Sequence, residues 1–374
     1  MSSDMDHLYM ARALQLARRG RYTTHPNPRV GCVLVKAGAI VGEGYHRRAG
    51  EPHAERRALA AAGTEAQGAT AYVTLEPCCH HGRTPPCSDG LIEAGVKRVI
   101  AAMPDPNPKV AGQGFAQLAA AGIEVVTGVM QAEAEALNPG FIKRMRAGLP
   151  YVRCKLAMSL DGRTAMANGE SKWITSAAAR EDVHRLRASS AAIMTGLGTL
   201  QADDPAMDVR LSHEALGIDA DLPIPHPVRV VLDPDLQTPP TAKMLSLPGQ
   251  VLILCSDEAR LRSAALEAAG AQVASLPMEG DNLNLHEVMG FLAEQEINEV
   301  LLESGAVLAG AMLAEGLIDE LVIYMAPHLM GNAARGLFHL PTVSGMDQRI
   351  PLQITDLRMV GADIRITATP ASAA

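Results

Sequence analysis

Three side chains in one stretch of the sequence are of the types that bind a transition metal. His53 supplies an imidazole, and Cys78 and Cys87 supply thiolates. Three protein ligands that leave a fourth position for water are typical of a catalytic zinc site, whereas a structural site fills that position with protein. The sequence therefore predicts one zinc ion per chain, Zn2+, held by His53, Cys78 and Cys87.

Glu55 lies two residues after His53, where a carboxylate can carry protons for a metal-bound water. The zinc-dependent deaminases have this pattern: His-x-Glu, then Pro-Cys, then a further Cys, with the Glu as acid and base and not as a ligand. We interpret Glu55 as catalytic. The competing ligands in the same loop rank lower, because Cys78 follows a proline directly, as the pattern requires; they are Cys79, His80 and His81.

These side chains need irregular helix ends to position them, because residues i and i+2 of a regular helix do not share a face. Pro52 and the residues after Glu55 predict a helix that begins near His53. The two prolines before Cys87 favour a second helix start there. A helix N-terminus lowers the pKa of a thiol, which helps to keep this ligand as a thiolate.

Strands and helices alternate along the first part of the chain, which indicates an α/β fold. We expect strands at residues 30–35, 39–44, 70–75, 98–102 and 124–127, and helices at 6–19, 53–62, 89–94, 113–121 and 130–145. A helix end, Gly148 and Pro150 then mark a domain boundary. We divide the chain into domains 1–147 and 148–374.

Alternation resumes in the second domain and ends in an expected hairpin at residues 352–369. Further strands are expected at 151–158, 191–195, 228–232, 251–255, 271–276, 299–303 and 320–325, with a helix at 177–188. The Gly-x-Gly turn at 195–199 and the small residues at 303–306 follow strands, where a helix start can receive a phosphate. Both features are common without any ligand, so the residues alone predict only an α/β domain that binds a ligand.

Composition argues against several classes of protein. The net charge of -8 and the 3% of aromatic residues do not favour nucleic-acid binding, and no run of about 18 apolar residues predicts a membrane span. The polar, acidic N-terminus is not a signal peptide. Three of the six cysteines cluster in one loop, which favours metal chemistry in a reducing compartment over disulfides. We expect a cytoplasmic protein without nucleic-acid or membrane partners.

Nearly the whole chain resembles one family, the bifunctional deaminase–reductases of riboflavin biosynthesis. In the first half the resemblance rests on Pro26-Asn27-Pro28, Gly44-Tyr45-His46, His53-Ala54-Glu55 and the long gap from Cys78 to Cys87. In the second half it rests on residues 155–162, 171–176, 195–199, 203–210 and 303–305.

The resemblance implies a cytidine-deaminase-like α/β/α sandwich followed by a dihydrofolate-reductase-like α/β domain that binds NADPH. The residues implied to contact the nucleotide are Ala157, Trp173, Thr199, Asp203, Gly305, Ala306, Val307, Leu308, Ala309, Gly310 and Ala311. Those implied to contact the substrate are Ser171, Arg187, Met207, Arg210 and Glu303, with the two arginines on its phosphate. Lys155 and Asp203 are candidates to orient or protonate the carbonyl that is reduced. Asn27 either forms a turn in its Pro-rich loop or binds a pyrimidine edge.

The expected function is two successive reactions on a small phosphorylated pyrimidine. The first is hydrolytic deamination of 2,5-diamino-6-(5-phosphoribosylamino)pyrimidin-4(3H)-one, and the second is NADPH-dependent reduction of its ribosyl side chain to ribityl. We also expect a homo-oligomer formed through the reductase domain. The alternatives are a deaminase of nucleic-acid bases and a non-catalytic binding protein stabilised by zinc.

Overall fold

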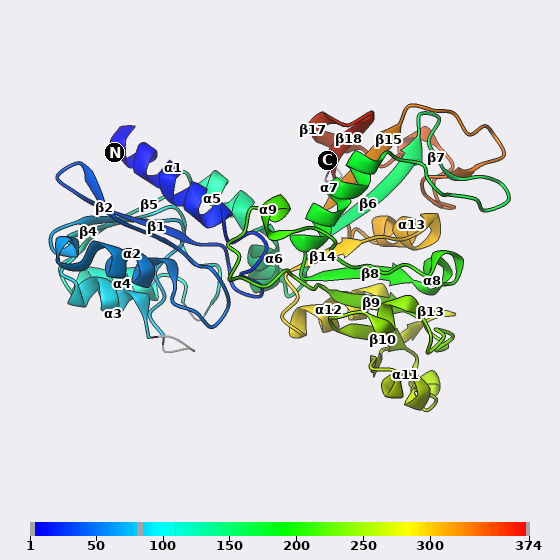
Figure 1. Cartoon of the computed structure of the whole chain (residues 1–374), viewed down its shortest axis with the longest axis horizontal. Coiled ribbons are helices and arrows are strands. Elements are labelled where there is room, and N and C mark those ends of the chain that lie inside the picture. Colours follow the sequence, from blue (N-terminus) through cyan, green and yellow to red (C-terminus); the bar gives the residue numbers. More distant parts are fainter. Residues whose placement is uncertain (1–3, 81–84, 109, 372–374) are drawn as a thin grey trace. The chain divides into compact units, whose positions relative to one another are not determined.

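The computed structural model describes residues 4–80, 85–108 and 110–371 (Figure 1). One proposed competing ligand, His81, lies outside these residues. The chain forms two compact units: unit 1 contains Met1–Gly148 and Gly217–Pro223, and unit 2 contains Leu149–Leu216 and Ile224–Ala374. Within the described part of the chain, no helix combines the length and apolar character needed to cross a membrane.

The described residues of unit 1 form a five-stranded sheet in the order β2-β1-β3-β4-β5. The strands are β1 (Gly31–Lys36), β2 (Ala39–Tyr45), β3 (Thr70–Val73), β4 (Arg98–Ala101) and β5 (Glu124–Thr127). β1 is antiparallel to β2 and β3, whereas β3, β4 and β5 are parallel. The carboxyl ends of β3 and β4 therefore open at one edge of the sheet, where the loops that carry Cys78 and Asp105 begin.

Helices cover both faces of this sheet, so the expected α/β/α sandwich is confirmed (Figure 1). One buried cluster joins the sheet to α1 (Asp4–Arg18), α5 (Gln131–Leu137) and α6 (Pro139–Ala147). A second cluster joins its other face to α2 (Ala54–Ala62), α3 (Cys87–Glu93) and α4 (Gln113–Ala120), with the short helix η1 (Gly63–Ala66) after α2.

Glycines on β2 bring α2 unusually close to the sheet. A Cβ atom at Gly42 would clash with the backbone oxygen of Ala58, and one at Gly44 would clash with that of Ala54. Only glycine allows this approach, which fixes the first turn of α2 against the sheet. The residue before that turn is His53.

The expected single helix at residues 130–145 is wrong, because the chain breaks at Asn138 into α5 and α6. Pro139 is the first residue of α6, a position that suits proline since its missing N–H would be unpaired there anyway. The Asn138 side chain accepts from Arg29 N at 2.7 Å and donates to Arg29 O at 2.9 Å. The break thus ties the helix pair to the Pro-rich loop that carries Asn27.

In unit 2 the described residues form a nine-stranded sheet in the order β11-β10-β9-β8-β14-β6-β15-β18-β17. The last two pairings are antiparallel and the others are parallel, so the expected terminal hairpin is confirmed. These strands are β6 (Tyr151–Ser159), β8 (Ala192–Gly196), β9 (Val228–Leu232), β10 (Val251–Cys255), β11 (Gln272–Ser275), β14 (Glu299–Leu302), β15 (Glu320–Ala326), β17 (Leu352–Val360) and β18 (Asp363–Pro370). Two small pairs accompany them: β7 (Arg163–Ala165) with β16 (Arg335–Gly336), and β12 (Met278–Glu279) with β13 (Asn282–Leu283).

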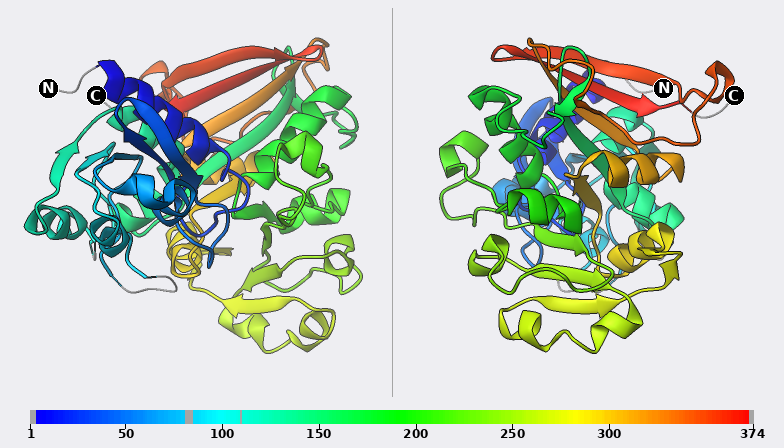
Figure 2. Two further views of the ribbon diagram at one scale, coloured as in Figure 1. Left: turned by 60° about the vertical axis from the view of Figure 1, so that its left-hand side comes forward. Right: turned by 90° about the vertical axis from the view of Figure 1, so that its right-hand side faces the viewer.

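Helices also cover both faces of the second sheet (Figure 2). One face packs against α12 (Leu285–Glu294) and α13 (Ala306–Ala314). The other packs against α7 (Ala177–Ala188), α8 (Leu197–Asp203), α10 (Asp257–Arg260) and α11 (Ala264–Ala268). The remaining helices are α9 (His213–Leu216), η2 (Lys243–Ser246) and η3 (Met346–Gln348).

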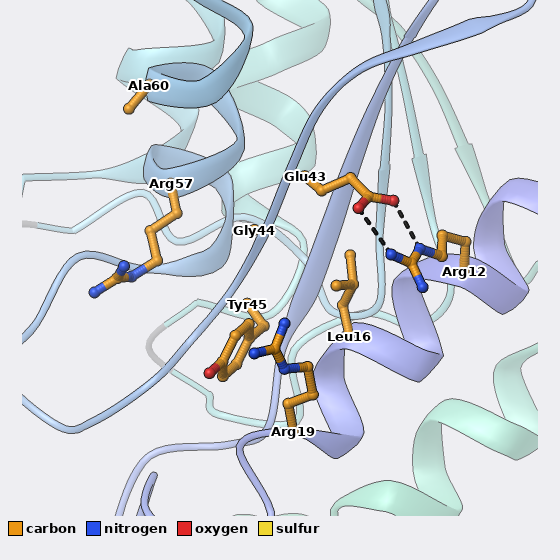
Figure 3. A pocket seen from close by; sticks show the side chains of 8 residues that line it. All are labelled: Arg12, Leu16, Arg19, Glu43, Gly44, Tyr45, Arg57 and Ala60. Atoms are coloured by element: carbon orange, nitrogen blue, oxygen red, sulfur yellow. Dashed lines mark hydrogen bonds and ion pairs between the residues drawn. The ribbon is translucent and has the colours of Figure 1, made fainter. Parts of the chain in front are cut away.

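The segment Gly217–Pro223 completes unit 1 through its acidic side chains, which sequence analysis did not anticipate. Asp219 accepts from Tyr45 OH at 3.0 Å and lies 3.2 Å from Arg19 Nη2. Asp221 accepts from Arg47 Nη2 at 2.6 Å. The Arg19 guanidinium lies over the Tyr45 ring. Both residues also line a surface pocket between α1, β2 and α2 (Figure 3). None of the proposed metal ligands lines that pocket.

Candidate active sites

The three predicted metal ligands meet in unit 1. His53 Nδ1 lies 3.5 Å from Cys78 Sγ and 3.4 Å from Cys87 Sγ. The three ligand atoms all lie within 4.8 Å of one another, and the described residues contain no other cluster of three His, Cys, Asp or Glu side chains with this geometry. Cys79, although next to Cys78, is not part of the group.

Two helix starts and one loop position the three ligands. His53 is the residue immediately before α2, and Cys87 is the first residue of α3. Cys78 lies in the loop after β3, and its sulfur accepts from the backbone N–H of Cys87 at 3.4 Å. The free N–H groups of a helix start favour negative charge, so this contact stabilises a thiolate at Cys78.

The protonation of the two cysteines fits a divalent metal. A hydrogen bond from the Cys87 thiol, together with His53, lowers the pKa of Cys78 to about 4. The same contact with Cys78 raises the pKa of Cys87. The pair therefore retains one proton by itself, and a cation would release it and hold both side chains as thiolates. An imidazole and two thiolates are a donor set typical of zinc.

Glu55 lies in the first turn of α2 with only 3% of its surface exposed. Burial, and then the negative charge of Cys78, raises the pKa of Glu55 to about 7. A carboxyl group with this pKa both takes and gives a proton near neutral pH, which is what a general acid–base residue needs.

Asn27 and His46 meet beside the metal ligands. Asn27 Nδ2 lies 3.0 Å from His46 Nε2, and the His46 and His53 rings are edge to face with centroids 5.2 Å apart. Burial, followed by the nearby His53, lowers the pKa of His46 to about 4, so the ring is neutral. When Nε2 accepts from Asn27, the Asn27 Oδ1 atom is left to accept from a ligand. In the sequence His46 stands out only as part of the Gly44-Tyr45-His46 motif, and no sequence signal predicts its contact with Asn27.

Glu76 is a second residue whose role the sequence pattern does not predict. Its buried carboxylate accepts four backbone N–H groups, those of Asp105 and Gly112 at Oε2 and those of Gly114 and Phe115 at Oε1. These donors belong to the loop after β4 and to the start of α4. Glu76 thus holds that loop against the segment that leads to Cys78.

In unit 2, the predicted cofactor residues Thr199 and Gly305 are in contact. Gly305 N donates to Thr199 Oγ1 at 3.2 Å, which joins α8 to the start of α13. These helices follow β8 and β14, two adjacent parallel strands whose carboxyl ends share one edge of the sheet. Ligands of open α/β sheets bind at such edges.

The run Gly305–Ala311 divides into accessible and buried residues. Gly305 and Val307 are exposed, and Val307 exposes 70% of its surface. Ala309 is fully buried in the core, and a Cβ atom at Gly310 would clash with the backbone oxygen of His339. The first turn of α13 is therefore accessible, whereas Ala309 and Gly310 pack inside the unit.

The other predicted residues of the reductase lie on a loop, on helix α8 and on strand β6 of unit 2. Lys172 Nζ lies 3.1 Å from Asp203 Oδ1, and Trp173 stacks under the Arg180 guanidinium at 4.5 Å with 70% of its surface exposed. Ser171 precedes these residues on the same loop. Ala157 lies on β6 opposite Tyr324 of β15.

A buried group of charges lies next to this edge. Arg187 pairs with Glu303 through two hydrogen bonds, of 2.6 and 2.9 Å. Burial lowers the pKa of Lys155, and the negative charge of Glu303 opposes that shift. Met207 is buried, whereas the Arg210 side chain is 63% exposed and lies 3.3 Å from Asp208 Oδ1. The two arginines predicted for phosphate thus differ: one is internally paired and the other is accessible.

Two family descriptions match the two halves of the chain. Residues 3–103 match the cytidine and deoxycytidylate deaminase zinc-binding region, and residues 150–366 match the RibD C-terminal domain. Riboflavin biosynthesis protein RibD of Escherichia coli (strain K12) is 51% identical over 363 residues, covering 96% of this chain and 98% of that protein. The protein of the same name from Haemophilus influenzae is 49% identical over 371 residues, covering 98% of both.

Solved structures show the same likeness over the whole chain. RibD of Acinetobacter baumannii, form 1, is 46% identical, with a TM-score of 0.91 over 98% of this chain and 99% of that one. A diaminohydroxyphosphoribosylaminopyrimidine deaminase/5-amino-6-(5-phosphoribosylamino)uracil reductase of Thermotoga maritima is 31% identical, with a TM-score of 0.84 over 98% and 99% of the two chains.

Proposed function

Because this chain belongs to the RibD family of riboflavin-biosynthesis enzymes, we propose that its two sites act in turn on one phosphorylated pyrimidine. The chain is a bifunctional enzyme, a zinc-dependent deaminase and an NADPH-dependent reductase. We assign the deaminase to residues 1–147 and the reductase to residues 148–374, except that the segment Gly217–Pro223 belongs to the deaminase unit. The substrate proposed for the first site is 2,5-diamino-6-(5-phosphoribosylamino)pyrimidin-4(3H)-one, as the name of the Thermotoga maritima relative suggests.

In the deaminase, His53, Cys78 and Cys87 would hold the metal. A zinc ion held there would lower the pKa of a water molecule enough for nucleophilic attack near neutral pH. Glu55 takes one proton from the attacking water and gives it to the ring nitrogen. It then takes a second proton from the new hydroxyl group on the attacked carbon and gives it to the amine, which leaves as ammonia. The Glu55 pKa of about 7 supports both transfers.

Asn27 and His46 orient the pyrimidine in this proposal. The Asn27 amide is held by His46, which leaves Oδ1 to accept from an amino or ring N–H of the substrate. The neutral His46 adds no charge beside the metal ligands. The free Oδ1 acceptor of Asn27 favours a pyrimidine edge that presents hydrogen-bond donors.

In the reductase, the first turn of α13 and Thr199 would bind the nucleotide phosphates, because helix starts offer free N–H groups. NADPH bound there would supply the hydride for reduction of the ribosyl carbonyl to a ribityl alcohol. Lys155 and Asp203 are the proposed groups to orient that carbonyl and deliver its proton. Trp173 and Ala157 complete the nucleotide contacts.

Arg210 would hold the substrate phosphate, since its guanidinium is exposed. Arg187 would act through Glu303, the residue with which it pairs, while Ser171 and Met207 shape the pocket. The observation that carries the whole proposal is the convergence of His53, Cys78 and Cys87 beside a carboxylate of raised pKa.

The test is a pair of assays on the purified enzyme. Ammonia should be released from the free diaminopyrimidine nucleotide and not from RNA or DNA. NADPH should be oxidised only once the deaminated product has been formed by the first site or is supplied. Ammonia release from nucleic acid would favour a base deaminase instead. Zinc binding without either reaction would favour a binding protein.

A homo-oligomer formed through the reductase unit is supported by an exposed apolar row on β17. Leu352, Ile354, Leu357 and Met359 expose 44%, 60%, 63% and 62% of their surfaces. A register shift after Ile354 keeps all four opposite even-numbered residues of β18, so they share one face of an edge strand. Replacing Leu357 and Met359 by Glu should dissociate the oligomer in sedimentation experiments. An unchanged sedimentation coefficient would contradict this surface.

We also propose that the enzyme works in the cytoplasm, where the proposed ligands Cys78 and Cys87 would stay reduced.

A further inference from the structure

Asp208 is fixed beside the exposed arginine of the reductase unit by its own backbone. Its carbonyl oxygen accepts from Arg187 Nη1 at 3.1 Å and lies 3.1 Å from His184 Nδ1, so helix α7 anchors the residue. The preceding Met207 is buried and adopts the left-handed conformation, with φ of 47°. The direction of the chain at Asp208 is therefore set by contacts that do not involve its side chain.

The Asp208 carboxylate faces cations. Its Oδ1 atom lies 3.3 Å from Arg210 Nε and 4.0 Å from Arg187 Nη1. This oxygen is buried and accepts no hydrogen bond from the residues that the structure describes. The negative charge of Asp208 also acts to raise the pKa of His184 and of Arg229. The carboxylate is thus held in place by charge attraction to the two arginines, without a donor directed at that oxygen.

Only one of the two nearest arginines is available to a ligand. Arg187 uses Nε and Nη2 for Glu303 and Nη1 for the Asp208 carbonyl, and its side chain is 12% exposed. Arg210 is 63% exposed, and its closest described acid is Asp208. Any anionic group that binds Arg210 therefore meets the Asp208 charge at close range.

We propose that Asp208 determines substrate affinity in the reductase: its carboxylate is an internal anion that competes with the substrate phosphate for Arg210. The inference rests on the proposed role of Arg210. Without substrate, Asp208 neutralises Arg210; with substrate, a phosphate dianion displaces that contact against the repulsion of Asp208. Asp208 thus weakens binding of the phosphorylated substrate and its product alike.

The decisive variant is Asp208→Asn, which removes the charge and keeps the shape and the backbone contacts. KM for the phosphorylated substrate should fall roughly three- to tenfold, as expected when one charge repulsion is removed from a partly exposed site. The effect should fall on KM and not on kcat. Inorganic phosphate should inhibit the variant at correspondingly lower concentration, and KM for the dephosphorylated substrate should not change.

The matched control is Glu181→Gln. Glu181 accepts from Arg185 at 2.7 Å on the exposed surface of the same helix α7, so this variant removes an acid–arginine pair away from the site. It should leave both KM values unchanged. Asp208→Ser serves as a second variant, and thermal unfolding of each variant verifies that the unit is folded.

Three results for Asp208→Asn would overturn the inference: a higher KM, which would mean that Asp208 orients Arg210; an equal change on both substrates; or no change.

Arg210→Ala separates this inference from the proposal on which it rests. If Arg210→Ala abolishes the preference for the phosphorylated substrate while Asp208→Asn does nothing, Arg210 keeps its role and Asp208 loses its own. If Arg210→Ala retains that preference, both assignments fail.

Discussion

Arg187 holds Glu303 through two parallel contacts in the reductase unit, with Nε 2.6 Å from Oε1 and Nη2 2.9 Å from Oε2. Both side chains are largely buried, with 12% and 14% of their surfaces exposed. Paired contacts of this kind fix the orientation of both groups. The pair joins α7 to the end of β14, so it connects the proposed substrate residues to the strand edge where the nucleotide would bind.

The Arg187–Glu303 pair makes stability depend on pH in the acid range. Burial alone would raise the pKa of Glu303, but the charges of Arg187 and Lys155 outweigh it and lower the pKa to about 2. A glutamate in an unfolded chain has a pKa of about 4.3. The ionised pair therefore adds about 3 kcal/mol to the free energy of unfolding above that pH, and this contribution is lost as the pH falls toward about 2. In urea unfolding, Glu303→Gln should be less stable than the parent protein near neutral pH, and the difference should shrink by about pH 3. A constant difference would show that the carboxylate charge contributes nothing.

Zinc binding should depend on Cys87 and not on Cys79. Cys87 belongs to the group of three ligands, and its replacement by Ser exchanges a thiolate for a poor ligand. Metal analysis of purified Cys87→Ser should therefore show much less than one zinc per chain. Cys79→Ser is the matched control from the same loop and should retain its zinc. Equal losses in the two variants would mean that the wrong cysteine has been assigned.

Glu55→Gln should separate the two activities. Glutamine keeps the shape of Glu55 but cannot carry a proton, so deamination should fall at least about a hundredfold. Zinc content should stay near that of the parent protein, because Glu55 is not among the three ligands. Reduction of the deaminated intermediate should be unaffected, since the two sites lie in different units. A parallel fall in the reductase rate would contradict the division into two sites.

Local sequence patterns predicted the helices and strands of this chain better than they predicted which strands lie side by side. Residue type and spacing predicted that His53, Cys78 and Cys87 lie together, and the strand–helix alternation predicted an α/β fold in both halves. The position of β14 between β8 and β6 was not predictable, because parallel pairing joins distant segments and leaves no local signal. The break at Asn138 did have a signal, Pro139, which the apolar periodicity of the neighbouring residues obscured.

The hydrogen-bond partners of the acidic residues were the hardest contacts to predict from the sequence. Asp219 and Asp221 have the composition of a solvated loop, yet their partners Tyr45 and Arg47 lie 174 residues earlier in the chain. Glu76 likewise accepts from backbone groups about thirty to forty positions away, and backbone donors cannot be identified from residue type. Only a structure brings such partners together.

Glu76→Gln should destabilise unit 1 and weaken its zinc site. Each Glu76 oxygen accepts two backbone N–H groups, at 2.9–3.3 Å. Because the amide NH2 of glutamine cannot accept, one buried and one partly buried backbone donor lose their partner. We expect a loss of about 3 kcal/mol in unfolding free energy. Zinc affinity in chelator competition should also fall, because Cys78 follows two residues later. The control Glu65→Gln removes an exposed pair with Lys36 at 3.4 Å and should cost less than about 1 kcal/mol. Equal stability of the two variants would refute the role of Glu76.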